Sequence, residues 1–251
     1  MVEYQFHEAL PNTITPICED PEPDRHTFAD IREDCDSEFV YCACCGCQTQ
    51  DPVVDGGGSG EDDGNGEQTF YMDLCDSCED PSSPEYTLRM QALRLRSAYG
   101  NHLASEQQRS HLLQPNRSYG DRKYTEATIM HEQCYQALYR MDEAVGKVFP
   151  IAADQNDSLV IDILELRFKM NPWYGYCHCA YIIKTKIGKF VFDPTGVQFG
   201  PRWPAFVLYK DYEYRILSHE SAIMFVEPLG FTKKDTDKKL ASLLQESRGC
   251  R

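Results

Sequence analysis

The stretch YGYCHCAYIIKTKIGKFVFDPTGVQFG (Tyr174–Gly200) decides the fold of the second half of the chain. Two runs rich in β-branched and aromatic residues, 176–184 and 189–193, flank a glycine turn and predict two adjacent strands. His178 stands early in the first strand, and Asp193 ends the second strand 15 residues later. Because the chain goes out along one strand and returns along the next, these two side chains can meet, and the carboxylate can orient the imidazole.

More strands are expected on both sides of this pair. Apolar residues alternate with polar or mixed residues over 158–168, which predicts a strand before the pair. Short apolar runs predict two further strands after it, at 205–209 and 213–217.

Helices are expected at the two ends of this region. Apolar residues at helical spacing predict one helix over 124–147, with Cys134 on its apolar face. Leucines among arginines predict one or two helices over 85–113, broken near Gly100, and a last helix is expected over 232–247. Helices followed by adjacent strands indicate an α+β fold in which the helix carrying Cys134 packs on an antiparallel sheet.

Charge divides the chain into two parts. Residues 1–80 hold 21 acidic residues against two arginines, a net charge of -19 within a total of -15, so residues 81–251 carry about +4. An acidic front end repels nucleic acid, whose binding depends on Lys and Arg contacts to phosphate, so no nucleic-acid partner is expected. No stretch approaches 18 apolar residues and no secretory signal pattern opens the chain, so we expect no membrane partner and a cytoplasmic or nuclear location.

Eight of the 12 cysteines lie in residues 1–80, and four of them form two C-x2-C pairs. Cys42 and Cys45 make the first pair, and Cys75 and Cys78 make the second. Two such turns supply four sulfur ligands at the corners of a tetrahedron, the arrangement of a structural zinc site. Without a secretory signal, metal binding is the better default for clustered cysteines than stable disulfides, and free or redox-active thiols are the other interpretations.

The first pair has a second register, because Cys44 and Cys47 are also spaced as C-x2-C. A glycine follows Cys45, which favours the Cys42/Cys45 pair, since glycine suits the turn behind a ligand. The region 38–80 resembles zinc ribbons and related knuckle modules. The Gly-rich acidic stretch 51–67 is interpreted as a flexible insertion that accounts for the long spacing between the pairs.

These observations predict three parts. Residues 1–37 form an acidic and mostly irregular arm, 38–80 the zinc-ribbon-like module, and 85–251 the α+β domain. The module and the acidic arm are expected to contact a protein partner.

Cys134 precedes His178 by 44 residues, and a thiol beside an imidazole loses its proton easily and becomes a nucleophile. A helix-borne Cys, a strand His and a strand Asp in a D-P-T-x-x-Q setting resemble the papain-like and transglutaminase-like cysteine enzyme superfamily over residues 124–200. The resemblance implies Cys134 as nucleophile, His178 as general base and then acid, and Asp193 as the residue that orients the imidazole. It also implies transfer of an acyl group from a peptide, protein or small acyl substrate to water or an amine.

The same residues allow a second interpretation. Cys134 on an apolar helix face is compatible with a buried core residue, and the His178–Asp193 pair is compatible with a structural hydrogen bond at a strand end. In that case the protein is a non-catalytic zinc-binding scaffold with a degenerate cysteine-enzyme fold. Accessibility of the Cys134 thiol and its reach to His178 distinguish the two functions.

Overall fold

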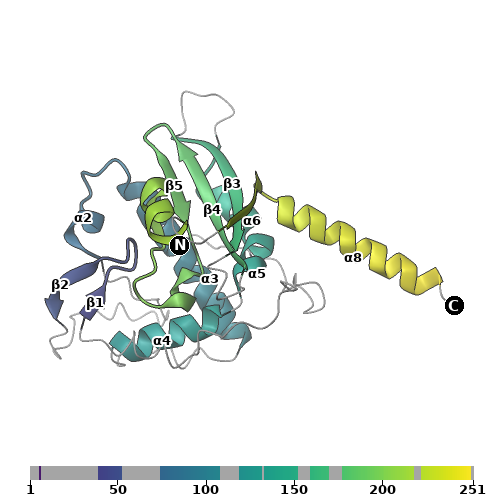
Figure 1. Ribbon diagram of the computed structural model, residues 1–251, viewed down its shortest axis with the longest axis horizontal. Coiled ribbons are helices and arrows are strands. Elements are labelled where there is room, and N and C mark those ends of the chain that lie inside the picture. The colour runs from purple at the N-terminus through teal and green to yellow at the C-terminus, as the bar shows by residue number, and fades with distance from the viewer. Residues whose placement is uncertain are drawn as a thin grey trace. The chain divides into compact units, whose positions relative to one another are not determined.

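The hairpin predicted around His178 forms the centre of a sheet (Figure 1). Strand β4 (Cys177–Thr185) pairs antiparallel with β5 (Lys189–Phe192), and the turn closes where Thr185 N–H donates to the Gly188 carbonyl oxygen at 2.8 Å. The Thr185 hydroxyl also accepts a 3.0 Å hydrogen bond from Gly188 N–H. The turn residues therefore satisfy one another, as a tight connection between strands requires.

The computed structural model of the chain falls into two compact units. The first unit combines residues 132–193 and 208–251 with 1–25, and the second combines 26–131 with 194–207. The residues described are 6, 39–52, 74–107, 119–131, 133–151, 159–169, 177–217 and 222–249. Apart from residue 6, the predicted arm 1–37 lies outside these residues, as does the Gly-rich insertion beyond residue 52, and the three predicted parts stay a prediction.

An antiparallel sheet of five strands, in the order β6-β5-β4-β3-β7, confirms the α+β fold class. β3 (Val160–Lys169) and β7 (Ala222–Pro228) extend the central hairpin on one side, and β6 (Phe206–Leu208) is the strand at the opposite edge. β3 pairs with β4 so that Phe168 lies opposite His178 and Arg167 opposite Cys179. Because side chains alternate across a strand, the register decides which of them share a face.

Short helices of the first unit pack against this sheet. α5 (Cys134–Arg140) is followed directly by α6 (Asp142–Val148), and the Tyr181 hydroxyl of β4 donates to the Ala137 carbonyl oxygen of α5 at 3.0 Å. α7 (Tyr209–Tyr212) continues into the π-helical segment η4 (Glu213–Leu217). The long helix α8 (Phe231–Gly249) ends the described chain, where a helix was predicted.

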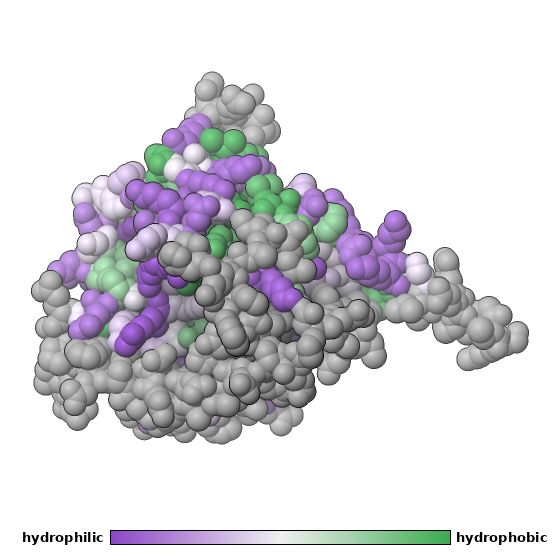
Figure 2. Space-filling view, in the orientation of Figure 1, coloured by the Kyte–Doolittle hydropathy of each residue, from purple (hydrophilic) through white to green (hydrophobic). Residues whose placement is uncertain are grey.

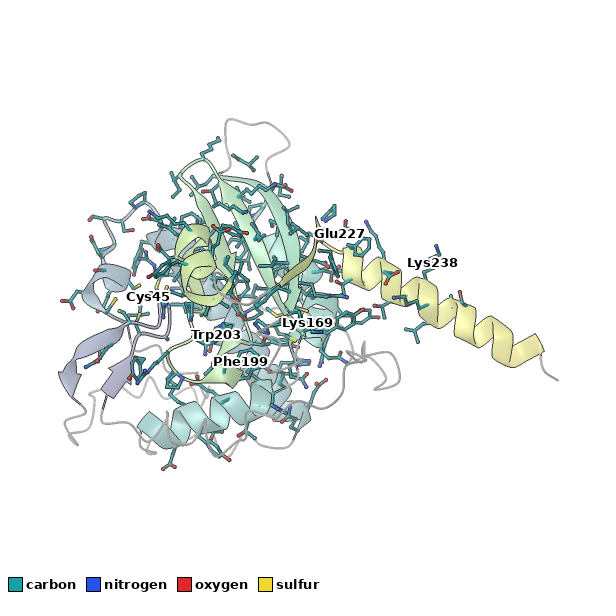
Figure 3. The ribbon with its side chains drawn as sticks, viewed as in Figure 1. Cys45, Lys169, Phe199, Trp203, Glu227 and Lys238 are labelled. Carbon is teal, nitrogen blue, oxygen red and sulfur yellow. The ribbon has the colours of Figure 1, made fainter. Side chains whose placement is uncertain are left out.

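The second unit contains the cysteine pairs and two longer helices. A two-stranded ribbon of β1 (Phe39–Tyr41) and β2 (Gln48–Pro52) surrounds the first pair, and the short helix α2 (Asp76–Glu79) follows Cys75. α3 (Tyr86–Glu106) and α4 (Tyr119–Met130) pack against each other, and η3 (Gly196–Phe199) packs on α4. Phe199 and Trp203, labelled in Figure 3, place their ring centroids 4.6 Å apart.

Three predicted elements differ in the structure. The helix expected over 124–147 is three separate helices, interrupted around 131–133 and again at Met141. α3 runs through Gly100 without a break, because one glycine costs a helix only about 1 kcal/mol and the surrounding leucines are buried. The strand expected at 213–217 is helical, and the apolar run that forms β7 was not predicted.

Polar and apolar residues are mixed on the described surface in the view of Figure 2. The exposed large hydrophobic residues are Ile151, Ile161, Ile187, Tyr214, Val226 and Phe231. Of the helices that the structure describes, none combines the length with the apolar character that crossing a bilayer demands.

Candidate active site and metal centre

Cys134 stands at the start of a helix. Because α4 ends at Met130, the residue is the first of α5 and not the middle of a longer helix, as the sequence had suggested. Backbone N–H groups in a first helical turn lack intrahelical partners and carry partial positive charge, which favours a thiolate. Its sulfur lies 3.6 Å from the carbonyl oxygen of Cys177, so the α5 start faces the start of β4.

His178 and Asp193 meet in the interior of the first unit. Nε2 of His178 lies 2.7 Å from Oδ2 of Asp193, and the two side chains expose 0% and 1% of their surface. Tyr212 of α7, itself buried, donates its hydroxyl to the same Oδ2 at 2.8 Å. The ring of Phe168 stands edge-on to His178, with centroids 5.4 Å apart, and fixes the imidazole from the neighbouring strand.

Electrostatics couple the Cys134 thiol to this pair. Burial lowers the pKa of His178, but the Asp193 carboxylate and the Cys134 side chain outweigh burial and raise that pKa to about 10. Since Asp193 takes Nε2, Nδ1 is the ring nitrogen that remains to exchange a proton with Cys134. The three residues can therefore hold a thiolate beside an imidazolium.

A second buried thiol acts on Cys134. The hydrogen bond from Cys179, more than the one from His178, lowers the pKa of Cys134 well below its ordinary value, against the opposing effect of burial. The same hydrogen bond and burial raise the pKa of Cys179 well above its ordinary value. Cys179 lies across from Arg167 on β3, whose guanidinium stacks on the Phe225 ring at 4.1 Å.

The four sulfur atoms of the cysteine pairs converge in the second unit. Cys42, Cys45, Cys75 and Cys78 place their sulfur atoms within 4.8 Å of one another, a group that could hold a metal ion. Tetrahedral zinc with Zn–S bonds of about 2.3 Å needs sulfur atoms about 3.8 Å apart. The Cys45 and Cys75 sulfur atoms are 3.8 Å apart, so this donor set fits such an ion. Figure 3 labels Cys45 beside the neighbouring sulfur atoms.

This geometry favours the Cys42/Cys45 register over Cys44/Cys47. Gly46 takes a φ of 67°, the left-handed conformation expected of the glycine behind the pair. Cys44 is outside the group of four and donates its thiol to the Phe206 carbonyl oxygen at 3.0 Å. Cys47 is exposed, and its sulfur lies 3.1 Å from that of Cys45.

One thiol of the cluster, that of Cys75, ionises more readily than an ordinary cysteine. Burial opposes ionisation of Cys75, but hydrogen bonds from the Cys78 N–H and from the Cys47 and Cys78 thiols outweigh it and lower its pKa to about 7. A thiolate is the form that binds metal, so at least one of the four ligands is ready near neutral pH.

Sequence reasoning named Cys134, His178 and Asp193, and the structure brings all three together; their catalytic role stays a prediction. It did not find Tyr212, which lay in no motif. Cys177 forms a disulfide, which the sequence had not indicated. Spacing along a strand does not reveal which distant cysteine a given thiol meets.

Comparisons with protein-family models, with curated proteins and with solved structures found no match to this chain.

Proposed function

We propose that the first unit is a cysteine-dependent acyl-transfer enzyme or hydrolase that works through Cys134, His178 and Asp193. The supporting observation is the 2.7 Å contact between Asp193 and His178, which leaves the other ring nitrogen for a thiol at a helix start. A helix supplies the thiol, a strand supplies the imidazole, and the residue after a strand supplies the carboxylate. These are the nucleophile, the base and the orienting group that nucleophilic catalysis needs.

The proposed reaction has two halves. The Cys134 thiol gives its proton to His178, and the thiolate attacks a carbonyl carbon to form a tetrahedral adduct. The leaving amine or alcohol takes the proton from His178 as its bond to carbon breaks, and a thioester remains on Cys134. His178 then removes a proton from water or an acceptor amine, which attacks the thioester and frees the thiol.

Burial limits what can react. Cys134 exposes 9% of its surface and His178 none, so both proposed reacting groups lie in the interior. A slender acyl end, such as a glutamine side chain or a small activated acyl donor, suits so buried a thiol better than a folded protein surface does.

Alkylation of Cys134 by iodoacetamide, followed by peptide mass spectrometry over a pH series, tests the proposal. We expect rapid labelling that persists well below pH 8 in the wild type and is lost in His178→Ala, whereas His102→Ala, a partly exposed histidine on α3, leaves it unchanged. Burst release of phenolate from an aryl acetate, with acetyl found on Cys134, is the second readout. Slow labelling in every variant contradicts an activated nucleophile.

A second function is favoured by the near-complete burial of the His178–Asp193 pair. A buried charged pair with a tyrosine donor also serves as a fixed structural element, which a non-catalytic scaffold needs. In this alternative Cys134 reacts no faster than an unactivated thiol, and the loss of His178 lowers the free energy of unfolding without changing the alkylation rate of the folded protein.

We further propose that Cys42, Cys45, Cys75 and Cys78 hold one structural zinc ion. Four thiolates and no open position are typical of structural sites, and binding contributes to folding. Elemental analysis by plasma mass spectrometry is expected to find one zinc per chain, lost in the Cys75→Ser/Cys78→Ser double variant and kept in Cys44→Ala, whose thiol bonds to a carbonyl. Purified protein without stoichiometric metal contradicts this proposal.

A further inference from the structure

One helix contacts both cysteine pairs of the second unit. Arg89 and Arg96 lie seven residues apart on α3, which is two helical turns, so both side chains leave the same face about 10 Å apart along the axis. This face is the one that meets the two turns carrying Cys42/Cys45 and Cys75/Cys78, called here the first and second knuckle.

Each arginine donates to the backbone of one knuckle. Nη1 of Arg96 donates to the Ala43 carbonyl oxygen at 3.2 Å, between the ligands of the first knuckle. Nη1 of Arg89 donates to the carbonyl oxygens of Cys78 at 3.0 Å and Ser77 at 3.3 Å in the second knuckle. The two guanidinium groups thereby tie both metal-binding turns to a single rigid helix.

The charge of Arg96 is only partly balanced by an acidic group. Arg96 is buried, and its second nitrogen lies 3.4 Å from Glu126, a carboxylate that Lys123 also reaches at 3.3 Å. Nε of Arg89 and Nε of Arg96 are buried and have no hydrogen-bond partner among the described residues. Holding cationic groups in the interior is costly unless negative charge lies near.

A metal centre supplies that negative charge. Four thiolates around a divalent cation sum to a net charge of -2, and the knuckle carbonyls that receive the arginines adjoin the sulfur ligands. We propose that Arg89 and Arg96 are positioning residues of the metal centre, which hold the two knuckles at ligand distance and offset the charge of the tetrathiolate. This inference rests on the proposed zinc site and assigns the helix that supports it.

We expect the two arginines to slow dissociation of the ion and to increase the affinity of the site for it. Groups outside the ligand set that orient ligands commonly change metal affinity by about 10- to 100-fold. Removal of either guanidinium lets one knuckle move relative to the other and leaves more uncompensated negative charge. The ion then dissociates faster, while the four sulfur ligands still bind it.

The test measures zinc release from the full-length protein into excess chelator, followed by absorbance of a zinc-sensitive dye. Arg96→Met and Arg89→Met are expected to release zinc about 10-fold faster than wild type, with a larger effect in the double variant. Arg94→Met, an exposed arginine on the same helix, is the matched control and is expected to match wild type. Arg96→Lys restores the charge without the planar fork and is expected to fall between Arg96→Met and wild type.

Release rates equal to that of Arg94→Met, in variants that bind one zinc and keep the circular dichroism spectrum of the wild type, overturn the arginine assignment alone. Wild-type protein without zinc overturns the metal proposal itself, so the two failures are distinguishable. Arg89 is not fully buried, and Arg89→Met therefore gives a result even where Arg96→Met does not fold.

Discussion

The hydroxyl of Tyr212 donates a 2.8 Å hydrogen bond to the same oxygen of Asp193 that faces His178 at 2.7 Å. Tyr212 comes from α7, which follows β5 and Asp193 along the chain, and its ring stands edge-on to Phe168 with centroids 6.2 Å apart. One phenylalanine thus touches the rings on both sides of the carboxylate. The carboxylate is held by two donors and the imidazole by a carboxylate and a ring, which restricts the orientation of His178.

Tyr212→Phe is expected to slow alkylation of Cys134 and to lower the free energy of unfolding by about 1.5–3 kcal/mol, the contribution of a hydrogen bond to a charged group. The ring and its packing remain, so the change isolates the hydroxyl. Peptide mass spectrometry and urea unfolding give the two values. Tyr209→Phe on the same helix is the control, since its ring lies under the Lys189 ammonium and its hydroxyl has no part in the Asp193 contact. Equal behaviour of the two variants would show that the hydroxyl does not position Asp193.

Stability is expected to depend on pH through His178. Its pKa rises from an ordinary value near 6.5 to about 10 on folding, so the folded state binds the proton more tightly. The resulting stabilisation is complete below about pH 6.5, declines as pH rises, and is absent above about pH 10. Urea unfolding of wild type and His178→Gln at several pH values checks this. The difference between the two proteins should shrink from neutral to alkaline pH, and a constant difference would contradict the charged pair.

Cys179→Ala is expected to move the acid limb of Cys134 alkylation toward higher pH, because the thiolate loses its main hydrogen-bond donor. Cys179→Ser keeps a donor at the same place and should restore labelling at low pH. Rates from peptide mass spectrometry over the pH series measure the shift. If only the lost side-chain volume mattered, the alkylation rate would change in both variants in proportion to that volume. Recovery of low-pH alkylation in Cys179→Ser would identify the hydrogen bond as the cause.

The parts of the fold that were predicted correctly have local causes. The hairpin around His178 is set by strand alternation and a glycine turn, and the turn of the Cys42/Cys45 pair is the one that Gly46 permits. The break before Cys134 escaped prediction because His131, Glu132 and Gln133 carry no helix-stopping residue, so tertiary packing decides it.

Two further differences have the same origin. The segment 213–217 has aromatic and β-branched residues typical of a strand, yet it continues the helical path of α7. Tyr212 reaches Asp193 from α7, directly before the segment that was expected to form this strand. The contact between Tyr212 and Asp193 depends on how separate segments pack against each other. Residue spacing along the sequence does not predict such packing.

Cys45→Ser is expected to keep a bound zinc ion, because the exposed Cys47 thiol lies 3.1 Å from the Cys45 sulfur and can take its place as the fourth ligand. Cys42→Ser and the Cys45→Ser/Cys47→Ser double variant are expected to lose the ion. Metal content after desalting, measured by plasma mass spectrometry, separates these cases. Complete loss in Cys45→Ser alone would show that Cys47 cannot reach the ion.

The start of α8 depends on a buried carboxylate in the middle of the sheet. Glu165 of β3 accepts hydrogen bonds from Gly230 N–H at 2.7 Å and Thr232 N–H at 2.9 Å, and from the Thr232 hydroxyl. These are the donors that a helix leaves unpaired in its first turn, so the side chain acts as a cap from a distant strand. Burial raises the pKa of Glu165 despite these donors.

Glu165→Ala is therefore expected to lower the free energy of unfolding by about 3 kcal/mol, since it leaves buried N–H groups without an acceptor. Glu165→Gln keeps one carbonyl oxygen and should cost less. Hydrogen exchange of the α8 amides is expected to accelerate in Glu165→Ala and to stay near wild type in Glu227→Ala, a partly buried glutamate on the neighbouring strand. If exchange in α8 is unchanged while global stability falls, the carboxylate supports the sheet and does not anchor the helix.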